Sequence, residues 1–310
     1  MKDGTHTVMI CTHCCHPVKS LYVAYSNNHI KLTDCPSCQN VVDSYVEYDN
    51  VLLFIDLLLL KPEAYRHLVF NSLESQLSKY PKWKANEKGA GFLRRLKLFV
   101  FNLRNWLLKF DRLNRIWILT IAFEVYLVWA SEERKYQTYY SYYSVNTNLL
   151  MNDVLQKDAL SQYTYFAIYS IIDISLLHNV TQYLLIHWLD WGAGNDYAKD
   201  VISYTILLSY GAKIFPILML IWPYDTLLST SIIQWVANLY IVEALKIVTN
   251  RGYFQILQVF FLVSFVRFVC VKPLLSLIVS NGDLSLAYEY LRGECEMSIH
   301  KIIANKHFFL

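Results

Sequence analysis

Charged residues are distributed very unevenly along this 310-residue chain. Residues 1–112 contain 25 Asp, Glu, Lys and Arg residues, whereas the 123 residues from 159 to 281 contain only 12. So long a charge-poor region excludes a simple cytosolic enzyme and is typical of helices that lie in a membrane. We therefore predict a mainly α protein, a polytopic α-helical membrane protein whose soluble part is confined to the N-terminal third.

Five apolar segments are candidates for membrane spans. The first is the least secure, because its 15 residues would form a helix of about 22 Å, short of a hydrocarbon core of about 30 Å, and it contains Glu124. The other four are each long enough to cross. We predict a transmembrane bundle over residues 116–279, with a C-terminal tail at 280–310 and four or five spans at 116–130, 163–186, 201–222, 227–248 and 253–279.

Five of the seven cysteines lie in the first 38 residues, and four of these form two Cys-x-x-Cys pairs. Two-residue spacers let both thiolates of a pair reach one ion, and two such knuckles complete a closed tetrahedral site. We predict a β zinc ribbon over residues 8–48, with a short hairpin between the knuckles and one structural Zn²⁺ held by Cys11, Cys14, Cys35 and Cys38. Cys15 could replace Cys14, although that spacing is the rarer knuckle. Two redox dithiols are a weaker alternative, because no βαβ pattern surrounds either pair.

Residues 49–78 are predicted to be the helical part of the same N-terminal domain. Their apolar run, 51–60, would form a helix of about 15 Å, half of a bilayer core, and Asp56 interrupts it. Two interpretations remain open. The helix packs on the ribbon with Asp49 or Asn50 as its N-cap, or it lies half-buried on a membrane surface.

A long string of residues follows the second knuckle. From Val42 to Asn71 it reads Val-Asp-Ser-Tyr-Val-Glu-Tyr-Asp-Asn-Val-Leu-Leu-Phe-Ile-Asp-Leu-Leu-Leu-Leu-Lys-Pro-Glu-Ala-Tyr-Arg-His-Leu-Val-Phe-Asn. Together with the two cysteine pairs, this string resembles the homology domain of the Arv family, over roughly residues 9–75. The resemblance implies an endoplasmic-reticulum membrane protein that acts in sterol movement and in sterol and sphingolipid homeostasis. It also implies a link to early assembly of glycosylphosphatidylinositol (GPI) anchors.

Eleven basic residues lie between Lys79 and Arg115, against only Glu87 and Asp111. Apolar residues recur among them at helical spacing, so we predict a basic amphipathic helix on a membrane surface over 79–115. Nucleic-acid binding is the alternative for a basic stretch beside a zinc ribbon, but the apolar spans that follow favour the membrane. By the positive-inside rule, this segment places the ribbon in the cytosol.

Charged residues inside the apolar segments are the only candidates for chemistry there. Asp173 and Lys213 would lie at similar depths in neighbouring spans, so we predict that they form an ion pair. The remaining charges are predicted to form an interfacial pair and to flank a helix broken at Pro273: Glu243 with Lys246, and Arg267 with Lys272.

We expect a non-enzymatic, multi-pass endoplasmic-reticulum protein with a cytosolic ribbon, because the sequence offers no nucleophile–base pair, phosphate loop or open metal site. Its expected partners are a sterol, a sphingolipid or another membrane lipid, and anionic lipid headgroups, but not nucleic acid. The alternative function is that of an accessory subunit or scaffold that supports early GPI-anchor biosynthesis.

Overall fold

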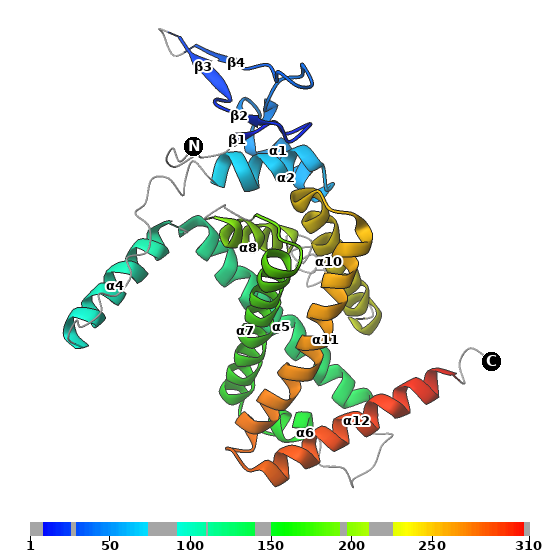
Figure 1. Cartoon of the computed structure of the whole chain (residues 1–310). Coiled ribbons are helices and arrows are strands. Elements are labelled where there is room, and N and C mark those ends of the chain that lie inside the picture. Colours follow the sequence, from blue (N-terminus) through cyan, green and yellow to red (C-terminus); the bar gives the residue numbers. More distant parts are fainter. Residues whose placement is uncertain are drawn as a thin grey trace. The chain divides into compact units, whose positions relative to one another are not determined.

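The structure is a computed structural model that describes residues 9–25, 29–73, 92–109, 111–139, 150–192, 197–210 and 226–306. The described residues are mainly helical, with short strands at the N-terminus (Figure 1). The chain divides into two compact units. The first comprises residues 1–118, 191–212 and 237–256, and the second comprises residues 119–190, 213–236 and 257–310.

Two small hairpins begin the first unit. Strand β1 (Met9–Ile10) pairs antiparallel with β2 (Pro17–Val18), and β3 (Tyr22–Ala24) pairs antiparallel with β4 (Ile30–Leu32). The β3–β4 hairpin confirms the one predicted between the knuckles. The β1–β2 hairpin was not predicted, because strands of two residues leave no alternating pattern to detect.

Short helices follow the hairpins in the order 3₁₀-helix η1 (Ser44–Val46), α1 (Asn50–Leu58), α2 (Pro62–Arg66) and the π-helical η2 (His67–Ser72). The Asp49 carboxylate accepts a hydrogen bond from the backbone N–H of Leu52 at 2.7 Å, which confirms Asp49 as the N-cap of α1. After α1, Leu60 adopts a φ of 57° and Pro62 opens α2. Proline suits that position because its missing N–H would have no helical partner there.

These short helices pack on apolar helices from the second half of the chain. The contacts are made with α8 (Ala198–Ser209) and with the last turns of α10 (Thr226–Thr249). Leu57 and Tyr65 pack with Ala244 and Ile247, and a neighbouring cluster contains Val69, Leu73, Val201 and Val248. In addition, the Tyr240 hydroxyl donates a 2.6 Å hydrogen bond to the carbonyl of Leu58. Residues far apart in sequence therefore form one core.

Two helices lie in the described part of the predicted basic segment and in the first predicted span, whereas residues 79–91 of that segment lie outside the described residues. The first, α4 (Phe92–Lys109), confirms the helical spacing and leaves seven large apolar side chains exposed: Leu96, Phe99, Val100, Phe101, Leu103, Leu107 and Leu108. The second, α5 (Asp111–Tyr139), has 29 residues and extends beyond the predicted segment at both ends.

The second unit is built from helices packed around Phe166 and Leu275, both almost completely buried. Its helices include α6 (Leu150–Leu155), α7 (Ala159–Tyr183) continued by the π-helical turn η3 (Leu184–Trp188), α11 (Tyr253–Val279) and α12 (Leu284–Lys306). Helix α12 occupies most of the segment that was predicted only as a tail. It is part of the fold because Tyr290 is buried in the same core as Phe166.

Asp173 is paired with Arg267, a partner that the sequence analysis did not assign to it. The guanidinium of Arg267 binds the carboxylate through two nitrogen atoms, with Nε 2.7 Å from Oδ1 and Nη2 on Oδ2. Lys213 lies outside the described residues. The predicted Glu243–Lys246 pair is confirmed, with 3.2 Å between Nζ and Oε1.

The predicted helix break at Pro273 is wrong, because α11 continues through this residue. A proline removes one helical N–H donor and tends to kink or break a helix. Here Val271 and Leu275, on either side of it, are buried in the core of the second unit. Packing on both sides of the proline therefore holds the helix together.

Among the helices of the described ranges, Tyr253–Val279 alone is long and apolar enough to cross a membrane, as judged by length and composition. The core helix of a soluble protein can meet the same criterion. The five-span bundle therefore stays a prediction.

We predict that the Asp173–Arg267 pair stabilises the second unit. Asp173→Asn and Arg267→Met should each lower the free energy of unfolding by about 3 kcal/mol, because each leaves a largely buried charge without its partner. The double variant should cost less than the sum. Thermal unfolding of the purified protein in detergent measures this, with the exposed Asp153–Lys157 pair as the matched control. Strict additivity would contradict the pairing.

Candidate metal centre

The four predicted zinc ligands come together in the first unit. The sulfur atoms of Cys11, Cys14, Cys35 and Cys38 all lie within 4.8 Å of one another. The Cys11–Cys38 and Cys14–Cys35 sulfur–sulfur distances are 3.7 Å and 3.6 Å. A tetrahedral zinc ion with Zn–S bonds of about 2.3 Å requires sulfur–sulfur distances of about 3.8 Å. The spacing therefore fits a closed four-thiolate site.

The backbone explains how each knuckle aims its two thiols at the same point. In the first knuckle the N–H of Cys15 donates to the carbonyl of Cys11, and in the second the N–H of Gln39 donates to the carbonyl of Cys35, both at 2.9 Å. Cys15 and Gln39 both adopt a φ of 61°. The two knuckles are therefore the same turn, repeated.

This repetition separates Cys14 from its neighbour Cys15. Cys15 occupies the left-handed position that Gln39 occupies in the second knuckle, and its sulfur is not part of the four-cysteine group. The side chains of His13 and His16 are exposed and do not belong to the four-cysteine group either. Of the two alternatives left open by the sequence, the geometry favours Cys14.

The thiols of the group differ strongly in acidity. Burial raises the pKa of the Cys11 thiol to about 12. In contrast, the backbone N–H of Cys38, assisted by that of Ser37, lowers the pKa of the Cys35 thiol to about 6. Only thiolates bind zinc, and a nearby dication favours the thiolate form. The Cys35 thiol therefore readily forms the thiolate that binds zinc. At Cys11, burial disfavours the thiolate, and a bound metal ion would have to offset that effect.

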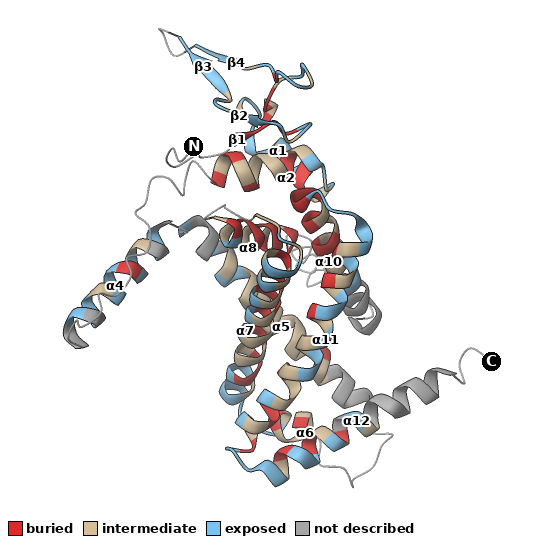
Figure 2. Ribbon diagram, in the orientation of Figure 1, coloured by how far each residue is buried: buried red, intermediate tan, exposed pale blue. Residues whose placement is uncertain are grey.

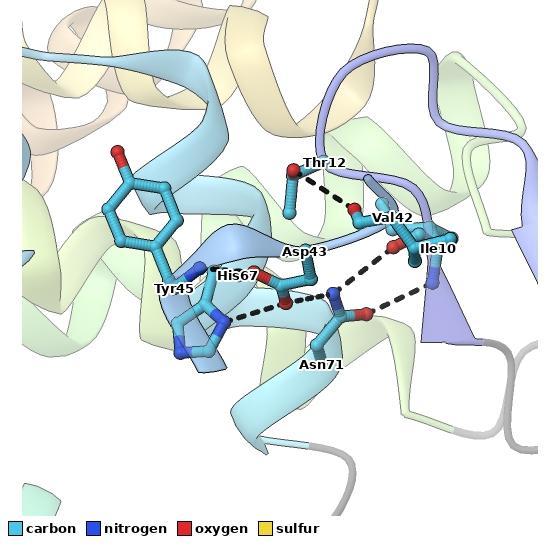
Figure 3. A network of polar contacts seen from close by, with 7 residues as sticks. All are labelled: Ile10, Thr12, Val42, Asp43, Tyr45, His67 and Asn71. Atoms are coloured by element: carbon cyan, nitrogen blue, oxygen red, sulfur yellow. Dashed lines mark hydrogen bonds and ion pairs between the residues drawn. The ribbon is translucent and has the colours of Figure 1, made fainter. Parts of the chain in front are cut away.

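A buried carboxylate lies next to the metal centre and connects it to the helices (Figure 3). Asp43 is completely buried. Its Oδ1 accepts from the N–H of Tyr45 at 3.1 Å, and its Oδ2 lies 2.7 Å from His67 Nδ1 and 2.6 Å from Asn71 Nδ2. Three partners therefore satisfy a charge that would otherwise be costly to bury.

The Asn71 side chain extends this network to the first strand. Its Oδ1 accepts from the N–H of Ile10 at 3.0 Å, and its Nδ2 donates to the carbonyl of Ile10 at 3.1 Å. From α2, Arg66 Nη1 donates to the carbonyls of Thr12 and His13 at 2.8 Å and 2.9 Å. Ile10 and Thr12, the two neighbours of Cys11, are thus each hydrogen-bonded by a side chain of the following helices, Asn71 and Arg66.

Sequence reasoning did not identify Asp43, His67 or Asn71 as a unit. A signal was present, since Asn71 directly follows the apolar residues Leu68, Val69 and Phe70. However, nothing in the spacing connects residue 71 to Ile10, because the contact joins residues 61 positions apart.

Comparison with known proteins identifies the family to which this arrangement belongs. The model of the Arv1-like family matches residues 10–245. The chain belongs to the Arv1-like family. It is 54% identical to "Protein ARV1" of Eremothecium gossypii over 305 residues, which cover 97% of this chain and 100% of the relative. It is 50% identical to "Protein ARV1" of Saccharomyces cerevisiae over 314 residues, which cover 94% and 98%.

Some more distant relatives match only a short part of the chain. "Protein ARV1" of Homo sapiens is 45% identical over 62 residues, or 20% of this chain and 23% of the relative. No solved structure matches the chain. The resemblance first seen in residues 9–75 thus extends over nearly the full length in the two most similar relatives named above.

We predict that loss of a single ligand abolishes metal binding. Cys35→Ser should remove zinc from the purified protein and unfold the ribbon, because the binding energy of a structural zinc, about 10–16 kcal/mol, is folding energy. Cys15→Ser is the matched control and should retain one zinc per chain. Elemental analysis by mass spectrometry measures both. A zinc-free wild-type protein, or loss of zinc in the control, would contradict the assignment.

We also predict that Asn71 holds the first knuckle in place. Asn71→Ala should destabilise the ribbon by about 2 kcal/mol, because it leaves the Ile10 backbone groups without their partner. The variant should therefore release zinc to a chelator at lower denaturant concentration. Asn179→Ala serves as control, since the Asn179 amide is exposed and donates to Ser175 in its own helix. Identical release by the two variants would show that the network is dispensable.

Proposed function

We propose that this chain is a multi-pass endoplasmic-reticulum membrane protein that assists intracellular sterol transport and sterol and sphingolipid homeostasis without catalysing a reaction. Membership of the Arv1-like family supports this proposal, because these are the roles that the resemblance to the Arv homology domain implies. In this proposal the zinc ribbon lies in the cytosol and the apolar helices lie in the membrane.

One observation carries the membrane location. Helix α11 exposes four phenylalanine side chains, each at least 65% accessible: Phe254, Phe261, Phe265 and Phe268. Large apolar side chains exposed together along one helix mark a surface that contacts another apolar phase. Because α11 is also 27 residues long, or about 40 Å, a lipid bilayer is the phase that fits it best.

The zinc centre has a structural role in this proposal. Four cysteines occupy all four positions of a tetrahedral ion, so no position is open for a substrate or a water molecule. The ion would join two knuckles that are also connected by the hydrogen bonds from Thr12 to the carbonyl of Val42. The hydrogen bonds of Asp43 and Asn71 would then transmit this rigidity to η2 and to β1.

The charges of the apolar helices support a structural rather than a catalytic role. Asp173 is the acidic residue that a membrane enzyme would be expected to use, but its carboxylate is bound by Arg267 through two nitrogen atoms. A carboxylate held in this way is poorly placed to act as a general base, because both of its oxygen atoms are engaged by the guanidinium.

The experiment that tests this function is purification of the full chain from its native membrane in polymer nanodiscs, followed by mass spectrometry of bound lipids and proteins. We expect sterol or sphingolipid to be enriched over the bulk lipid of the same membrane, and Cys15→Ser to behave as the wild type. Bound lipid of bulk composition would contradict a direct lipid role. Stoichiometric copurification of GPI-anchor biosynthesis subunits, without lipid enrichment, would favour the accessory-subunit alternative.

A further inference from the structure

Helix α1 buries its charge and exposes its apolar residues. Val51 and Leu59 are each 66% exposed, whereas Asp56 is only 4% exposed. Figure 2 colours each residue of the ribbon by its burial, and α1 contains both exposed and buried positions. Val51, Ile55 and Leu59 are spaced four residues apart and therefore share one face. Leu52 and Phe54, on the flanks of this face, are exposed as well. This pattern is the reverse of that of a helix on the surface of a soluble domain.

Specific contacts fix this orientation. Asp56 lies on the inner side of α1, where it accepts a 2.8 Å hydrogen bond from the Tyr45 hydroxyl and a 2.7 Å contact from Lys61 Nζ. The ammonium of Lys61 lowers the pKa of Asp56, which keeps the carboxylate charged. Rotating α1 to bury its apolar face would break both contacts and expose Leu57, which packs in the core with Tyr65. The exposed face is therefore built into the fold.

The point at which α1 contacts α10 indicates how deep α1 would lie in a membrane. The carbonyl of Leu58, the last residue of α1, accepts a hydrogen bond from Tyr240, whose neighbour Leu239 is itself strongly exposed. Three and six residues further along α10, Glu243 and Lys246 form a polar cluster with the Tyr253 hydroxyl. A cluster of Lys, Glu and Tyr at a helix end is typical of a membrane interface. At 1.5 Å per residue, α1 contacts α10 about 5–9 Å on the apolar side of this cluster.

From this arrangement we propose that α1 is an interfacial helix that inserts its Val51–Leu59 face among the acyl chains of the membrane leaflet beside the zinc ribbon. The proposal rests on the membrane location argued above. The depth matches that of interfacial helices, whose apolar faces lie about 5–10 Å below the boundary between headgroups and acyl chains.

A lipid leaflet fits this face better than a protein partner does. Apart from Asn50 at its first position, the exposed side chains of α1 are aliphatic or Phe54, and Val51, Ile55 and Leu59 offer no charged or amide group that would specify a partner. It also adjoins α10, which exposes Leu239 in the same unit. A continuous acyl phase would cover both helices, whereas a protein ligand would have to fit two differently directed surfaces.

Photocrosslinking in native membranes tests the proposal. Phe54 is replaced, in the full-length chain, with the photoreactive residue p-benzoylphenylalanine, and adducts are identified by mass spectrometry after irradiation. Phe261 of α11 is the matched positive control, and Tyr25 at the end of β3 is the negative control. All three side chains are exposed, by 49%, 67% and 57%. Retention of zinc shows that each variant is folded.

We expect phospholipid or sterol adducts at positions 54 and 261 and none above background at position 25. Lipid adducts at 261 but only protein adducts, or no adducts, at 54 would overturn the interfacial helix and leave the membrane location intact. Lipid adducts at all three positions would overturn it as well, because the labelling would then be non-specific. Absence of lipid adducts at both 54 and 261 would overturn the membrane location, and the inference with it.

Discussion

The buried carboxylate of Asp43 is the interaction on which the N-terminal part of the molecule depends. It accepts hydrogen bonds from Tyr45 and Asn71 and lies against His67. Asn71 in turn bonds both backbone groups of Ile10, directly before Cys11. Two-residue strands cannot hold the first knuckle by themselves. The cysteines are therefore positioned as much by side chains of the following helix as by their own turns.

A second buried carboxylate, that of Asp56, sets the orientation of α1. Asp56 is satisfied by Tyr45 and Lys61, so burying it requires no loss of hydrogen bonding. Because Asp56 and Leu57 occupy the inner side of the helix, Val51 and Ile55 face outward. Asp56, which interrupts the apolar run 51–60, is thus the residue that fixes which side of α1 faces away from the protein. In the second unit, Arg267 likewise satisfies the carboxylate of Asp173, which lies among apolar helices.

Tertiary contacts also decide whether a proline lies at the end of a helix or inside it. Pro62 opens α2, where a proline without an N–H costs nothing, whereas Pro273 lies inside α11. The difference is packing, since Val271 and Leu275 are buried around Pro273. Likewise, burial of Tyr290 makes α12 part of a core, although residues 280–310 have no apolar run long enough to predict this. Helix boundaries in this chain follow burial more closely than composition.

The sequence by itself determined the features that depend on local spacing. Two-residue spacers identified the four cysteines, a hairpin was predicted between the knuckles, the start of α1 was narrowed to Asp49 or Asn50 as N-cap, and the Val42–Asn71 string identified the family. Tertiary structure alone decided what depends on residues distant in sequence. It paired Asp173 with Arg267, placed Asn71 against Ile10 and buried Asp56 on the inner side of α1. The physical reason is that spacing constrains neighbours along the chain, whereas the partner of a buried charge is whichever group the completed fold places beside it.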